Sequence, residues 1–164
     1  MIPRKKLTPE QAYQKLKHYC AYQERSHMEV KTKAYSFGLR KSETEELTSK
    51  LIEEGCLNEE RFARSFAGGK FRMKQWGRVK IKAELKKRQV SSYCINLAIQ
   101  EIDEKKYKEV LNRLAIKRWE SIKGAGTNLF IKMAKTRDYL LLKGFESNLV
   151  TSEIQQLSKK EKAA

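Results

Sequence analysis

Three segments of the sequence resemble one another, and in each a helical pattern ends at a tight turn. The turns are Gly38-Leu39, Gln89-Val90 and Gly144-Phe145, so the repeat recurs about every 50 residues. A longer helical pattern precedes each turn and a shorter one follows it, which predicts a unit of three helices. A unit this small buries little surface alone and has to lean on its neighbours.

An all-α fold follows from proline usage and apolar spacing. Proline occurs only at positions 3 and 9, and no segment shows a convincing strand alternation. Capping boxes are predicted at Thr8 with Gln11 and at Ser42 with Glu45. One apolar stripe at helical spacing comprises Phe62, Phe66, Gly69, Met73 and Trp76. We predict three tandem three-helix repeats in an elongated arrangement.

The predicted organisation divides the chain at the helix starts. It comprises an N-terminal segment at 1–8, repeats at 9–57, 58–102 and 103–157, and a basic C-terminal tail at 158–164. The Gly-rich stretch at 124–126 lacks the Gly-Lys-Ser/Thr of a phosphate loop, so it is predicted to join two helices. The Gly68-Gly69 pair inside a helix indicates either a bend or close packing.

Positive charge follows the repeat. The chain has 36 Lys and Arg against 20 Asp and Glu, a formal net charge of +16. Residues 61–90 hold eleven basic side chains and one acidic one, whereas 42–60 and 91–104 are net negative. The first two helices of each unit are therefore basic and the third is acidic or neutral. This excess indicates a polyanion or an acidic partner.

Nine of the 21 residues from 70 to 90 are Lys or Arg, and these supply most of the candidate contacts. Arg78, Lys82 and Lys86 lie four residues apart and form one helical stripe, beside Ile81 and Leu85, which should be buried. The alternative is a solvated charged face, although such faces usually mix signs. The candidate contact residues are Arg25, Lys70, Arg72, Lys74, Arg78, Lys80, Lys82, Lys86, Lys87, Arg88, Lys132, Lys135 and Arg137.

The turns resemble those of helix-turn-helix regulators, which read bases with the helix after the turn. Here that helix carries Glu43, Glu45 and Glu46, and its counterpart in the second unit has no basic residue. Phosphates would repel such a helix. A sequence-blind electrostatic contact by the basic second helices is therefore favoured over operator reading.

Aromatic residues divide into two groups. Phe71 lies opposite the apolar stripe among basic residues, so it either stacks on a base or packs on a neighbouring unit. The others at helical spacing are predicted to be core residues: Trp76, Trp119, Tyr107 and Tyr139.

No motif for catalysis or metal binding stands out, and we predict a non-enzyme without a cofactor. Cys20, Cys56 and Cys94 are far apart and form no Cys-x-x-Cys pair. His18 lies two residues from Cys20, but without a second ligand pair both are ordinary helix positions. All three cysteines are expected to be free thiols in a reducing compartment. Without a secretory signal or an apolar span, we expect a cytoplasmic protein that does not enter a membrane.

Four motifs in order resemble those of the RecX regulatory proteins, over roughly residues 10 to 157. The first is "ERSHMEVKTKAYSFGL", with Arg25, Ser26, Glu29 and Gly38-Leu39; the second is "LIEEGCLNEERFA", with Gly55, Leu57, Asn58, Glu59, Phe62 and Ala63. The third is "WGRVKIKAELKKRQV" and the fourth "LLLKGF", with Lys143, Gly144 and Phe145. One departure is Gln89, where that family usually has glycine; a left-handed turn costs more there.

The resemblance implies three tandem three-helix units and a monomer that binds the RecA filament on DNA. It implies inhibition of the RecA ATPase, strand exchange and coprotease activity, in recombinational repair and the SOS response. The basic residues would then face RecA and single- or double-stranded DNA. The alternative is an architectural protein that binds DNA without sequence preference and has no recombinase partner.

Overall fold

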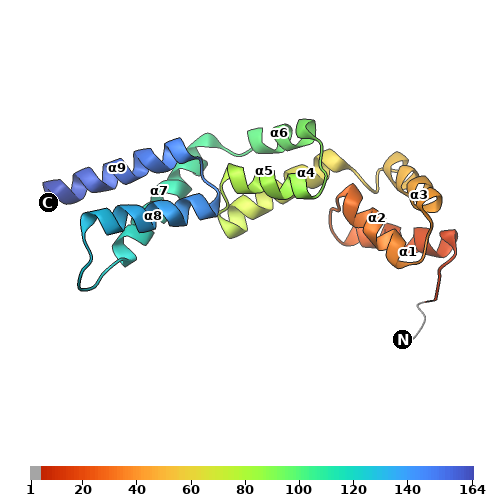
Figure 1. Cartoon of the computed structure of the whole chain (residues 1–164). Coiled ribbons are helices and arrows are strands. Elements are labelled where there is room, and N and C mark those ends of the chain that lie inside the picture. Colours follow the sequence, from red (N-terminus) through yellow and green to blue (C-terminus); the bar gives the residue numbers. More distant parts are fainter. Residues whose placement is uncertain (1–4) are drawn as a thin grey trace. The chain divides into compact units, whose positions relative to one another are not determined.

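The computed structural model describes residues 5–164, and in this range the chain is helical without a strand (Figure 1). The all-α prediction is confirmed. The elements are α1 (Pro9–Tyr22), α2 (His27–Ser36), α3 (Lys41–Glu53), α4 (Glu59–Gly69), the π-helix η1 (Lys70–Lys74), α5 (Arg78–Lys87), α6 (Ser92–Gln100), α7 (Glu104–Ser121), α8 (Leu129–Lys143) and α9 (Ser147–Ala163). None of these helices is long and apolar enough to cross a bilayer.

The described residues form two compact units. The first comprises the described residues up to Phe66 together with Glu84–Ala98, and the second comprises Ala67–Ala83 together with Ile99–Ala164. The repeat boundaries inferred from sequence remain a prediction, and residues 1–4 of the predicted N-terminal segment lie outside the described range. Residues 158–163, expected as a basic tail, continue helix α9.

The first unit has its core among α1, α2 and α3, which contact one another. Leu16, Val30 and Leu51 are fully buried there. The predicted capping box of Thr8 and Gln11 starts α1, and Ser26 with Glu29 forms another at the start of α2. These side chains satisfy backbone N–H groups that the first helical turn leaves unpaired.

The predicted capping box at Ser42 is wrong. Helix α3 begins at Lys41 with Arg40 as its N-cap, and no side chain accepts a hydrogen bond from the first turn. Ser42 therefore lies one residue inside the helix, because the chain enters α3 directly from the Gly38-Leu39 turn.

The three predicted turns share one backbone conformation. Gly38, Gln89 and Gly144 have φ of 84°, 59° and 97°. The N–H of the next residue, for example Val90, donates to a helix carbonyl five residues back, which closes the helix end. Gln89 thus adopts the left-handed geometry that usually requires glycine, at a steric cost.

The second unit buries its core among α7, α8 and α9, which contact one another. Tyr107 is fully buried, and its ring lies 5.3 Å from that of Phe145. Phe71, from η1, lies 5.8 Å from the Tyr107 ring and is 8% exposed. Phe71 thus packs on Tyr107, a residue of the predicted third repeat, as one of its two interpretations expects, and its burial leaves no exposed ring face for stacking on a base.

The π-helix η1 changes the helical phase that the sequence pattern assumed. A π-turn accommodates an extra residue, so side chains after it rotate relative to an α-helix. Met73, expected in the apolar stripe, is 82% exposed, whereas Phe71 is buried. Tyr107 and Trp119 are buried as predicted, but Trp76 and Tyr139 are only half-buried.

Candidate nucleic-acid interface

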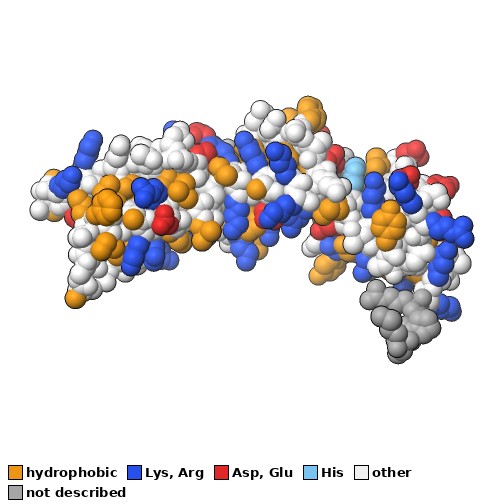
Figure 2. Space-filling model, in the orientation of Figure 1, with side chains coloured by type: hydrophobic (Ala, Val, Ile, Leu, Met, Phe, Trp, Pro, Cys, Tyr) orange, Lys and Arg blue, Asp and Glu red, His pale blue; other side chains and the backbone are white. Residues whose placement is uncertain are grey.

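Lysine side chains from η1, α5 and α8 lie close together in the second unit, two of them beside the half-buried Trp76. The ammonium groups of Lys70 and Lys80 lie 5.0 and 4.5 Å from the Trp76 ring centroid. The Lys143 ammonium donates to the Lys74 carbonyl oxygen at 2.7 Å. We call Lys70, Lys74, Lys80 and Lys143 the lysine cluster. On the face shown in Figure 2, Lys and Arg side chains also gather over α4 and α5.

Two glycines allow the backbones carrying these lysines to meet. The Gly77 N–H donates to the Lys143 carbonyl at 2.8 Å, and the Val79 N–H donates to the Gly144 carbonyl at 2.9 Å. A Cβ on Gly77 would lie 2.2 Å from the Gly144 carbonyl oxygen, and a Cβ on Gly144 would lie 2.2 Å from that of Lys80. This close approach brings Lys143 beside lysines that lie 63 to 73 positions earlier in the sequence.

The cluster concentrates positive charge. Partial burial lowers the pKa of Lys143, and the neighbouring charges of Lys80 and Lys74 lower it further. Like charges held together in this way favour binding of an anion, because a bound anion relieves their repulsion. The Trp76 ring supplies a face for the lysine ammonium groups. Such a site suits phosphate oxygens in a backbone contact without base reading.

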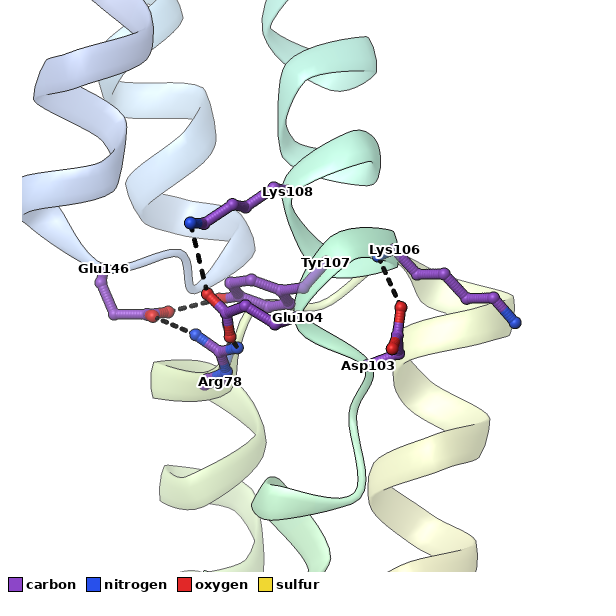
Figure 3. Close-up of polar contacts among 7 residues, drawn as sticks. All are labelled: Arg78, Asp103, Glu104, Lys106, Tyr107, Lys108 and Glu146. Atoms are coloured by element: carbon purple, nitrogen blue, oxygen red, sulfur yellow. Dashed lines mark hydrogen bonds and ion pairs between the residues drawn. The ribbon is translucent and has the colours of Figure 1, made fainter.

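Arg78, a member of the predicted stripe, forms ion pairs with two carboxylates of its own unit. Its guanidinium donates to Glu146 at 2.9 Å and to Glu104, and it lies 3.8 Å from the Tyr107 ring centroid (Figure 3). The Arg78 side chain is only 16% exposed. Burial alone would lower the pKa of Arg78, but the hydrogen bonds to both carboxylates outweigh it and raise the pKa. Arg78 therefore joins α5 to the N-terminal ends of α7 and α9, and its charge is already balanced by two carboxylates of its own unit.

The same network holds Tyr107. Its hydroxyl donates to Glu146 and accepts the Arg78 backbone N–H at 3.0 Å. Burial and the bond to Glu146 raise the pKa of Tyr107. The phenol consequently stays neutral and keeps donating its proton.

Replacing Arg78 by methionine should lower the free energy of unfolding by about 2–3 kcal/mol, because two carboxylates lose their shared partner. Lysine at the same position should recover only part of this loss, since a single ammonium cannot bridge both carboxylates as a planar guanidinium does. Urea denaturation measures both effects. Arg113→Met, an exposed position on α7, should change stability by less than about 0.5 kcal/mol; an equal loss there would contradict the bridging role.

The remaining stripe residues differ in availability. Lys82 and Lys86 are exposed, and no ion pair joins either to a carboxylate within the described chain. Lys87 and Arg88 both pair with Glu84, at 3.1 and 3.0 Å. Hydrogen bonds from these two cations lower the pKa of Glu84. Ile81 and Leu85 are fully buried, as predicted.

The other candidate residues lie outside the lysine cluster. Arg72, Lys135 and Arg137 are exposed. Lys132 pairs with Glu161 at 2.7 Å and its side chain is 21% exposed, so much of its charge is neutralised locally. Arg25 belongs to the first unit, where its guanidinium stacks on Tyr19.

Sequence patterns do not place Lys143 in the lysine cluster, because its proximity to Lys74 and Lys80 depends on the pairing of distant segments. Within the described residues, no group of His, Cys, Asp and Glu is arranged to hold a metal ion. Cys20 and Cys94 are buried and Cys56 is half-buried, and burial raises the pKa of Cys20 to about 11.

Comparison with known proteins identifies a fold and a domain. Residues 58–99 match the family model described as RecX, second three-helix domain. The crystal structure of RecX from Lactobacillus salivarius is similar with a TM-score of 0.80 and 25% identity, covering 91% of this chain and 96% of that one. A second crystal structure, of regulatory protein RecX, has a TM-score of 0.80 at 20% identity, covering 90% of this chain and 71% of that one. No curated protein matches the sequence.

Proposed function

Because the chain belongs to the RecX family, we propose that it regulates the RecA recombinase by binding the RecA–DNA filament, with inhibition as the result. The proposal extends to the RecA ATPase, strand exchange and coprotease activity, in recombinational repair and the SOS response. The protein would act in the cytoplasm as a monomer, with no catalytic step of its own.

The lysine cluster is the observation that supports a filament or DNA contact. Backbone pairing between Gly77 and Lys143 holds together the segments that carry these lysines, and the Lys143 ammonium is held by the Lys74 carbonyl. Several positive charges on adjacent segments favour contact with phosphate groups. Lys82 and Lys86, exposed farther along α5, extend the positive surface of that helix.

The third helices, which are acidic or neutral, make operator reading an unsuitable alternative. Helix α3 exposes Glu45 and Glu46, which would repel the phosphates flanking a major groove. Binding that depends on phosphate and on the RecA surface needs no base reading by these helices. Each three-helix repeat would then act as a spacer that places its basic helices along the filament.

A titration of RecA ATPase on single-stranded DNA tests the proposal. We expect the chain to suppress ATP hydrolysis at amounts below one molecule per RecA monomer, because one molecule on a filament contacts several subunits. An architectural DNA-binding protein without a recombinase partner would reduce hydrolysis only when it covers the DNA. Full ATPase activity at substoichiometric protein, with DNA binding retained, would therefore support that alternative and contradict RecA regulation.

A further inference from the structure

A groove in the first unit, between α1 and α2, combines aromatic rings with positive charge. Its volume is about 680 Å³. The lining residues are Gln14, Lys15, His18, Tyr19, Tyr22, Arg25, Lys33 and Phe37. Three of these are aromatic and three are Lys or Arg, and none of the eight is acidic.

Cations stand beside each aromatic ring of the groove. The Arg25 guanidinium lies 3.7 Å from the Tyr19 centroid and 5.9 Å from that of Tyr22. Lys33 lies 5.5 Å from the Tyr19 ring and 5.6 Å from that of Phe37, and Lys15 lies 5.8 Å from the Phe37 ring. The Arg25 Nε also donates to the Tyr19 carbonyl at 3.0 Å, which fixes the guanidinium in place.

Tyr22 is exposed without a packing role that would explain it. Its side chain is 81% exposed at the last residue of α1. Among the described residues no ion pair joins Lys15, Arg25 or Lys33 to a carboxylate. The groove therefore offers ring faces and uncompensated charge on the same surface.

We propose that this groove binds single-stranded nucleic acid, with a base stacked on Tyr22 and the flanking phosphates held by Lys15 and Lys33. The proposal rests on the proposed function for its choice of ligand, since single-stranded DNA is what the RecA filament contains. Each base has a π-face that stacks on an aromatic ring, and each phosphate supplies a negative charge that pairs with the lysine ammonium groups. The Arg25 guanidinium, preorganised on Tyr19, adds a second planar surface.

Single-stranded nucleic acid fits the groove better than a duplex or a protein segment. In a duplex the bases are already stacked on one another, so Tyr22 would gain no stacking partner. An acidic peptide would satisfy the charge of Lys15 and Lys33 but would not need an exposed planar ring. Only an unpaired strand uses both features.

The test is binding of a fluorescently labelled oligothymidylate to the full chain, followed by anisotropy at several salt concentrations. Tyr22→Ala should weaken binding about 5- to 100-fold, the range for loss of one base–aromatic stack. Tyr22→Phe should restore affinity, because stacking needs the ring and not the hydroxyl. Tyr93→Ala, at a position 71% exposed on α6 of the same unit but outside the groove, should leave affinity unchanged.

Two further arms separate stacking from charge. Against an abasic strand of equal length, Tyr22→Ala and the unaltered protein should bind equally, and Tyr22→Ala should keep the salt slope. Lys15→Gln with Lys33→Gln should instead lower that slope by about 1.4, or 0.7 for each lost phosphate. The proposal is overturned if Tyr22→Ala keeps full affinity for oligothymidylate, or if its loss is as large on the abasic strand. It is also overturned if polyglutamate displaces oligothymidylate from the Tyr22→Phe variant and, in addition, duplex DNA and an abasic strand bind that variant as tightly as oligothymidylate does.

These outcomes are separate from the test of RecA regulation. If the unaltered protein leaves RecA ATPase unaffected while Tyr22→Ala weakens oligothymidylate binding, the groove proposal stands and the proposed regulatory function fails. If the unaltered protein inhibits RecA but Tyr22→Ala keeps full affinity for oligothymidylate, the groove proposal fails and the proposed regulatory function stands.

Discussion

Gly77→Ala should lower the free energy of unfolding by about 3 kcal/mol, the upper part of the range for overpacking a close contact. The new Cβ would lie 2.2 Å from the Gly144 carbonyl oxygen and 2.4 Å from the Phe145 nitrogen. Both are backbone atoms of a left-handed turn, and Gly144 is itself packed closely against Lys80. Because the clash is with backbone and not with a flexible side chain, the turn has to shift, and the hydrogen bond from Gly77 to Lys143 should be lost.

Gly69→Ala is the matched control for this substitution. Gly69 has φ −64° and ψ −47°, which any residue adopts, and no atom lies within 4 Å of an added Cβ. Alanine there should leave stability unchanged or raise it by up to about 1 kcal/mol, because it restricts the unfolded chain. Urea denaturation of the two variants measures the difference. Equal stability of both variants would show that residues 77 and 144 do not meet as described.

Local patterns in the sequence predicted most of the helices and the turns between them. The left-handed turns at Gly38 and Gly144 could be predicted because glycine at a helix end readily adopts a left-handed conformation. The capping box at Thr8 is likewise local. The error at Ser42 has a local cause too: Arg40, without a capping side chain, could start α3 because the preceding turn already fixes the chain direction.

The π-helix could not be predicted from periodicity. A stripe of apolar residues was extended through η1 with the phase of an α-helix, which placed Met73 inside and Phe71 outside. The buried face instead runs through Ala63, Ala67 and Phe71, and packing of Phe71 on Tyr107 from a distant helix fixes it there. The buried partner lies 36 positions away, so no window around Phe71 contains the information.

For the candidate site, too, some features could be predicted from the sequence and others depend on distant contacts. Charge density along residues 70–90 correctly indicated a basic surface, but a count of charges does not show which are already paired. Arg78 lies against Glu104 and Glu146, 26 and 68 residues away. Lys143, missed by the sequence pattern, joins Lys74 across 69 residues. Tertiary pairing thus neutralises Arg78, one of the candidate contact residues, and brings Lys143, which is not among them, into the lysine cluster.

Substituting Lys74, Lys80 and Lys143 by glutamine should reduce the salt slope of single-stranded DNA binding by about 2, since each lost phosphate contact contributes about 0.7. Glutamine removes the charge, and at position 143 its amide still offers a donor to the backbone carbonyl of residue 74. With a slope lower by 2, the loss of affinity between 50 and 200 mM salt is about 20-fold smaller for the variant than for the unaltered protein. Anisotropy of an oligomer across this range measures the slope, and unfolding in urea shows whether the second unit remains intact.

A charge-matched variant decides whether position or net charge is responsible. Lys105, Lys117 and Lys123, all exposed in the same unit, lose the same three charges when changed to glutamine, but they surround no common ring. If the lysine cluster binds phosphate, this control keeps most of the slope and the RecA inhibition, while the cluster variant loses both. Glu43, Glu45 and Glu46 changed to glutamine on α3 should leave binding equal or stronger, because these carboxylates repel DNA. Equal losses in both lysine variants would mean that the positive charge acts through the whole surface, and the cluster would have no special role in binding.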